Sequence, residues 1–130
     1  MLTWIIAAIA LYYCGLFIPS ILKLTQMGMV WGAGPQDVRP ERTIMLGRAE
    51  RAHENIKENL PAFLAVATLT LVLGVAPAAL TGAAVWVIAR AIYLPLYILG
   101  VPVLRTLVFG ISLIGLIMMI LALTSAPIPA

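Results

Sequence analysis

Long apolar runs alternate with one polar segment along the chain. Four stretches contain no Asp, Glu, Lys or Arg: residues 1–22, 59–89, 91–104 and 106–130. Most of the charges lie between Lys23 and Glu58. An α-helix rises about 1.5 Å per residue, so about 20 apolar residues cross the roughly 30 Å hydrocarbon core of a bilayer. The pattern therefore predicts membrane-spanning helices, with the charged segment largely outside the hydrocarbon.

Glycine and proline indicate where these helices end. We expect helices over about residues 2–25, 43–74, 77–99 and 102–124, and a solvent loop over about residues 26–42. The loop is rich in Gly, Pro and mixed charge, and the sequences GVAP and GVP form the short turns. Pro102 suits a first helical position, because its missing N–H needs no partner there. The chain is thus predicted to be one all-α domain over residues 1–130, an integral membrane four-helix bundle.

Composition agrees with a membrane location. Hydrophobic residues make up 63% of the chain and charged residues 10%, with a mean hydropathy of +1.09. Such a chain is too apolar for a soluble domain of this length. The net charge of +3 comes from the polar segment and two isolated arginines, so it indicates membrane orientation and not a nucleic-acid surface. Cys14 is the only cysteine, which excludes an internal disulfide, and we expect no metal site.

The positions of the cations predict the orientation of the chain. The loop and its flanks carry Lys23, Arg39, Arg42 and Arg48, whereas the turn at residues 74–77 carries none. Positive charge gathers on the cytoplasmic side of membrane proteins. We therefore expect a multi-pass protein with the loop in the cytoplasm and both termini outside; in a bacterium this is the inner membrane, with periplasmic termini.

Two polar stripes are predicted to enter the membrane. The apolar part of the second helix, residues 60–73, covers only about 21 Å, so part of the polar stretch before it must lie in the hydrocarbon. Arg51, Asn55 and Glu58 follow one another there at i, i+4 and i+7, and therefore share one helix face.

Arg90, Tyr93 and Tyr97 form a similar stripe on the third helix, at matching depth. A lone arginine in hydrocarbon costs at least about 2.5 kcal/mol. Our interpretation is that Glu58 and Arg90 form an ion pair inside the bundle.

A further cation lies at the start of the last predicted helix. Arg105 and Thr106 lie in its first turn, where free backbone N–H groups already favour an anion. With the two stripes, they predict a pocket for a small polyanion that carries an amine. The same residues also fit structural roles: a polar helix end in water, a lock between helices, interfacial tyrosines, or a cationic anchor at a helix start. Those alternatives stay open.

Two motifs carry a resemblance to a known family. The stretch RAERAHENIKENLPAF, followed by ARAIYLPLYILG, is similar to the signature of the MAPEG family, the membrane-associated proteins in eicosanoid and glutathione metabolism, and especially to its short bacterial members. The resemblance spans the whole chain. It implies a homotrimer of four-helix protomers, with glutathione as co-substrate bound between neighbouring subunits near the cytoplasmic surface.

The resemblance also assigns roles to single residues. It implies that glutathione is bound by Arg51, Asn55, Glu58, Arg90, Tyr93 and Tyr97, with Lys23 replacing a further basic contact. Arg105 matches an arginine near the thiol, and Thr106 stands where the prostaglandin synthase member has a serine. Two positions depart from the pattern. Glu54 replaces an arginine that several members use to hold a glutathione carboxylate, and Phe109 replaces a tyrosine of some catalytic members.

The implied function is that of a membrane-bound glutathione-dependent transferase or peroxidase. The thiol of glutathione has a pKa of about 8.5, and only the thiolate attacks. Arg105 and the Thr106 hydroxyl would stabilise the thiolate, and the membrane would deliver a hydrophobic electrophile or lipid hydroperoxide. The alternative is a non-catalytic trimeric membrane protein that binds an anionic metabolite or lipid headgroup. A small transporter is less favoured, because no broken-helix symmetry occurs.

Overall fold

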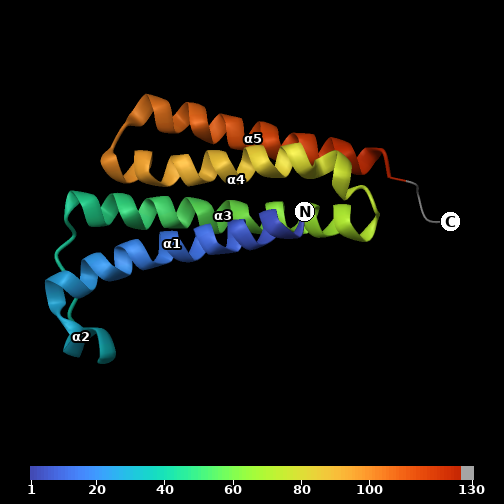
Figure 1. Ribbon diagram of the computed structural model, residues 1–130. Helices are drawn as coiled ribbons and strands as arrows, with labels where there is room; N and C mark the ends of the chain where they lie inside the picture. Colours follow the sequence, from blue (N-terminus) through green and yellow to red (C-terminus); the bar gives the residue numbers. More distant parts are fainter. Residues whose placement is uncertain (127–130) are drawn as a thin grey trace.

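Five helices make up the computed structural model, which describes residues 1–126 (Figure 1). The four long helices are α1 (Leu2–Met27), α3 (Ile44–Val72), α4 (Ala76–Leu99) and α5 (Pro102–Thr124). A short helix, α2 (Met29–Ala33), lies in the connection between α1 and α3. Within residues 1–126 there is no β-strand, so the protein is all-helical over the part that the structure describes.

The four long helices lie side by side in the order α1, α3, α4 and α5 (Figure 1). α4 and α5 pack most extensively, and α3 contacts all three other long helices. By contrast, α1 and α5 do not approach each other closely. The loop and α2 extend beyond one end of the helices, and the start of α1 and the end of α5 lie toward the opposite end (Figure 1). The polar segment of the sequence is therefore concentrated at the end that carries α2.

The outside of the helices is apolar. Phe17, Val72 and Leu121 are 57%, 76% and 59% exposed, respectively. By length and composition, α1, α4 and α5 are long and apolar enough to cross a membrane, whereas α3 is not among them. The charged first half of α3 accounts for this difference. The protein is thus an integral membrane protein with three membrane-capable helices, and the crossing by α3 stays a prediction.

Aromatic and small residues join α4 to its neighbours. Between α3 and α4, the fully buried rings of Phe63 and Trp86 stack with their centres 4.2 Å apart. Between α4 and α5, Gly82 and Gly115 let the two backbones touch: a Cβ at Gly82 would lie 2.6 Å from the Gly115 carbonyl oxygen. Close backbone approach at small residues is how helices pack tightly in membranes.

The turn between α4 and α5 requires glycine. Gly100 has a φ of 78°, which L side chains rarely adopt. A Cβ there would also lie 2.4 Å from Cζ of Arg48 on α3. Nη1 of Arg48 donates a hydrogen bond of 3.4 Å to the Leu99 carbonyl oxygen. One arginine thus connects the first turns of α3 to the α4–α5 turn.

The observed helix bounds differ little from those expected, except in the loop. α5 spans Pro102–Thr124, as the sequence predicts, and α3 begins after Thr43, whose side chain accepts a 3.2 Å hydrogen bond from the Leu46 N–H. The prediction of one solvent loop over residues 26–42 is wrong in part, because α2 (Met29–Ala33) forms within it. A five-residue helix between glycines is too short to show a hydrophobic period.

Candidate functional site

A buried arginine links α4 to α3. Arg90 is fully buried, and its Nη1 donates a hydrogen bond to Oδ1 of Asn55. Its Nε and Nη2 have no hydrogen-bond partner within the described chain. Instead, Cζ lies 4.6 Å from the ring centre of Phe109 and 5.5 Å from those of Trp86 and Tyr93. The charge is therefore held by one amide oxygen and by the faces of three aromatic rings.

The predicted ion pair between Glu58 and Arg90 is wrong. Glu58 is exposed, and it forms no ion pair within residues 1–126. The rotation of the helix explains this, because about 100° per residue places Glu58 about 200° around α3 from the buried Ile56. Asn55 precedes Ile56 and lies on the flank of α3, from which its shorter side chain reaches Arg90.

A pocket of about 240 Å³ lies beside the hydrogen bond between Arg90 and Asn55, where α3, α4 and α5 meet. Its lining residues are Asn55, Tyr93, Tyr97, Arg105, Thr106 and Phe109. Five of them were singled out by the sequence as site residues, and Phe109 as a departure from the family pattern. Arg90 does not line the pocket. It acts on the pocket indirectly, by setting the position of the Asn55 side chain.

Arg105 supplies positive charge to the pocket. Its Cζ lies 4.3 Å from the ring centre of Tyr97, and its side chain is half-buried. Its guanidinium forms neither an ion pair nor a hydrogen bond with any residue in the part of the chain that the structure describes. Stacking on Tyr97 therefore orients this guanidinium, while its N–H donors remain available to an anion.

The Thr106 hydroxyl is engaged by its own helix. Its Oγ1 donates a 2.9 Å hydrogen bond to the Pro102 carbonyl oxygen, one turn earlier. To donate to a thiolate, the hydroxyl would first have to leave this acceptor. Of the two residues expected to act on sulfur, Arg105 has free donors in this structure and Thr106 does not.

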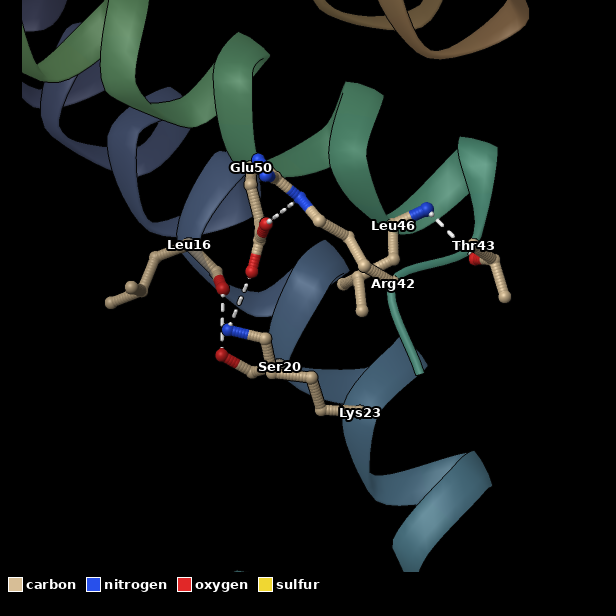
Figure 2. Close-up of polar contacts among 7 residues, drawn as sticks. All are labelled: Leu16, Ser20, Lys23, Arg42, Thr43, Leu46 and Glu50. Atoms are coloured by element: carbon tan, nitrogen blue, oxygen red, sulfur yellow. Dashed lines mark hydrogen bonds and ion pairs between the residues drawn. The ribbon is translucent and has the colours of Figure 1, made fainter. Parts of the chain in front are cut away.

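The structure does not bring the other predicted residues to this pocket within one protomer. Arg51 and Glu58 are exposed on the outward side of α3. Lys23, at the end of α1, forms a 2.9 Å ion pair with Glu50 instead (Figure 2). The stripe expected from Arg51, Asn55 and Glu58 is therefore divided, because only Asn55 turns toward α4.

A second polar cavity was not anticipated from the sequence. It has a volume of about 470 Å³ and lies under the loop; we call it the loop chamber. It is lined by Lys23, Trp31, Gln36, Arg39, Pro40, Arg42, Leu46 and Glu50. Figure 2 shows the Glu50 carboxylate between Lys23 and Arg42, whose Nε lies 3.5 Å from Oε2. No local motif could reveal this cavity, because its residues come from three separate segments.

Comparison with known proteins assigns the chain to a family. The sequence model of the MAPEG family matches residues 1–125, so the chain belongs to the MAPEG family. No curated protein and no solved structure matches the chain. The family assignment made from the motifs on α3 and α4 is therefore confirmed. Within residues 1–126, no three His, Cys, Asp or Glu residues gather in a way that could hold a metal ion.

Proposed function

We propose that this protein is a membrane-bound glutathione-dependent transferase or peroxidase that acts on a hydrophobic electrophile or a lipid hydroperoxide. Membership of the MAPEG family fits such a role. The observation that carries the proposal is the guanidinium of Arg105, which has free donors in a pocket shared with Tyr93, Tyr97 and Asn55. A half-buried guanidinium with free donors is suited to an anionic sulfur.

In this proposal each pocket residue has a distinct task. Arg105 lies near the thiol of glutathione and favours the thiolate. The phenols of Tyr93 and Tyr97 and the amide of Asn55 donate hydrogen bonds to the polar groups of the peptide. Arg90 is a positioning residue, since it is buried behind the pocket and holds Asn55 through Oδ1. The Asn55 amide nitrogen is thereby left to face a ligand.

The outward charges on α3 support a proposed homotrimer of four-helix protomers. Arg51 and Glu58 are exposed in the isolated protomer, although they lie on a helix packed among membrane-capable helices. Charged side chains within a membrane almost always face protein or water. A neighbouring copy against this face would cover both residues and extend the site to them. Lys23 would reach glutathione only from such a neighbour, because within the protomer it pairs with Glu50.

The proposed chemistry needs little from the protein beyond binding and charge. The thiol proton passes to water, and Arg105 stabilises the remaining thiolate. The sulfur then forms a bond to an electrophilic carbon, and the leaving group departs with the bonding electron pair. With a hydroperoxide, two glutathione thiols are oxidised to the disulfide while the hydroperoxide is reduced to an alcohol and water. An apolar substrate would enter from the lipid.

The experiment uses the full chain in lipid nanodiscs. We expect millimolar glutathione to raise the unfolding temperature, and conjugation of 1-chloro-2,4-dinitrobenzene to proceed with a rate that Arg105→Ala lowers at least about tenfold. Lys57→Ala is the control, because Lys57 is exposed and pairs with Glu54 at 2.9 Å, outside the pocket. Absence of any thermal shift with glutathione would refute the proposal.

Two observations favour a non-catalytic alternative, a trimeric membrane protein that binds an anionic metabolite or headgroup in the same pocket. The Thr106 hydroxyl is bonded to Pro102, and Phe109 presents a ring face to Arg90 where some catalytic members have a phenol. Glutathione binding without conjugation of an electrophile or reduction of cumene hydroperoxide would support this alternative over catalysis.

A further inference from the structure

The loop between α1 and α3 is folded into an arch. Nε1 of Trp31 donates a 2.7 Å hydrogen bond to the Val38 carbonyl oxygen. Nε2 of Gln36 donates a 3.0 Å hydrogen bond to the Gly32 carbonyl oxygen. These two side-chain bonds tie the segment after α2 back onto α2. The loop chamber beneath the arch is therefore formed before any ligand enters.

The lining of the loop chamber carries an excess of positive charge. The lining includes three cations, Lys23, Arg39 and Arg42, and a single carboxylate, that of Glu50. Glu50 pairs with Lys23 at 2.9 Å and with Nε of Arg42 at 3.5 Å (Figure 2). Arg39 forms no ion pair within residues 1–126. With three cations and one carboxylate, the lining carries a net charge of +2, which suits an anion such as a phosphate.

Apolar side chains are exposed on α2 and in the loop beside the chamber. Met29 and Val30 on α2 are 76% and 90% exposed, and Val38 beyond it is 66% exposed. Apolar side chains of this size are unfavourable in water and favourable at the boundary between headgroups and acyl chains. Trp31, which follows Val30 on α2 and lines the chamber, is of the residue type that prefers this boundary. These residues indicate that α2 lies in the membrane interface, which sets the chamber at the level of the headgroups.

We propose that the loop chamber binds the phosphate of an anionic phospholipid from the leaflet at this end of the protein. Lys23, Arg39 and Arg42 donate to the phosphate oxygens, and α2 inserts beside the acyl chains. Glu50 holds two of these cations in place and competes with the phosphate for them. Within one protomer the chamber shares no lining residue with the pocket around Arg105. Lys23 alone takes part in both proposals, because a neighbouring copy would bring it to glutathione. The lipid experiment contains no glutathione and tests the chamber by itself.

The first experiment counts bound lipid on the full chain. The protein is reconstituted in nanodiscs of phosphatidylcholine with phosphatidylglycerol, transferred to a mild detergent and examined by native mass spectrometry. We expect preferential retention of phosphatidylglycerol. Combined Arg39→Ala and Arg42→Ala should weaken its binding about 10- to 30-fold, since each cation contributes about 1 kcal/mol. Lys57→Gln, an equal loss of charge per residue at an exposed site outside the chamber, should leave retention unchanged.

Two further variants separate lipid binding from loss of structure. Glu50→Gln removes the competing carboxylate and should strengthen phosphatidylglycerol binding, a direction that mere unfolding cannot produce. Val30→Asp leaves the cations in place but should lower the retention of phosphatidylglycerol. It should also weaken the quenching of Trp31 fluorescence by brominated lipid. The Trp31→Phe variant gives the fluorescence of the other tryptophans, which is subtracted. Equal retention of the two lipids, or weaker binding in Glu50→Gln, would overturn the proposal.

A water-soluble phosphate is the alternative ligand for the loop chamber, because it offers the same oxygen acceptors as the phosphate of a lipid. Inorganic phosphate and glycerol 3-phosphate are added at millimolar concentration to the complex with phosphatidylglycerol. We expect no displacement, because neither ligand gains from the interface around α2. Displacement by either would show that the loop chamber serves a water-soluble phosphate, and the lipid assignment would be wrong.

Discussion

Arg90 donates a hydrogen bond from Nη1 to Oδ1 of Asn55, and thereby joins the middle of α4 to the flank of α3. Asn55 also lines the pocket that contains Arg105. A bond deep in the protein thus sets one wall of a site open to ligands. Both the stability of the fold and the shape of the pocket depend on this pair.

Removing the Asn55 amide should destabilise the protein strongly. Asn55→Leu removes the only polar acceptor that the buried Arg90 has within the described chain, and loss of a hydrogen bond to a charged group costs about 1.5–3 kcal/mol. Glu58→Gln should change the free energy of unfolding by less than about 0.5 kcal/mol, because Glu58 is exposed. Unfolding in mixed micelles with increasing dodecyl sulfate measures both. Similar losses in the two variants would show that Glu58 supports Arg90 after all.

Arg105 and Thr106 should contribute unequally to any thiol chemistry. Arg105→Ala removes the free guanidinium of the pocket, and kcat/KM for electrophile conjugation should fall at least about tenfold. Thr106→Val should lower it by less than about threefold, because the hydroxyl proton is already bonded to the Pro102 carbonyl oxygen. The ultraviolet absorbance of bound thiolate provides a second readout. A larger effect from Thr106→Val would mean that its hydroxyl turns toward the sulfur when glutathione binds.

Adding one methyl group at the contact between α4 and α5 should destabilise the fold. Gly115→Ala places a Cβ 2.7 Å from both the Gly82 carbonyl oxygen and the Trp86 nitrogen, so the helices must separate. Overpacking of this kind destabilises by about 1–3 kcal/mol. Gly110→Ala is the matched control on the same helix, because nothing lies within 4 Å of its added Cβ. Thermal unfolding followed by circular dichroism should show a lower midpoint for Gly115→Ala alone.

The proposed trimer predicts which face of α3 meets a second copy. Ala65 is exposed, whereas Ala67, two residues later, is fully buried inside the protomer. In a Cys14→Ala background, Ala65→Cys should give cross-linked dimers and trimers with a short trifunctional maleimide, and Ala67→Cys should give none. Gel electrophoresis after reaction in nanodiscs measures this. Monomer alone from Ala65→Cys would argue against an interface on this face.

Much of the helical architecture follows from local sequence. The run at 102–124 begins with proline after a glycine turn, and its bounds agree with those of α5. The turns containing glycine and proline, together with the lengths of the apolar runs, also locate α1, α3 and α4 to within a few residues. By contrast, α2 could not be expected, because a helix of five residues carries no period and depends on the Trp31 and Gln36 bonds around it.

The candidate site was predicted as a set of residues but not as an arrangement. Asn55, Tyr93, Tyr97, Arg105 and Thr106 line one pocket, whereas Lys23 lies in a different cavity with Glu50. Spacing along α3 predicted one shared face for Arg51, Asn55 and Glu58, yet it does not say which of them turns toward α4. That depends on the rotation of α3 about its axis, which is set by the packing of Ile56 and Phe63.

The sequence by itself determined that this is an all-helical membrane protein of the MAPEG family, because apolar run length, glycine and proline turns and contiguous motifs are properties of neighbouring residues. Only the tertiary structure decided that Asn55 and not Glu58 accepts from Arg90, and that Lys23, Arg42 and Glu50 enclose a chamber. Such hydrogen-bond and ion-pair partners depend on how each helix is rotated about its axis and on where the loop folds back. Both are set by contacts between segments far apart in the chain.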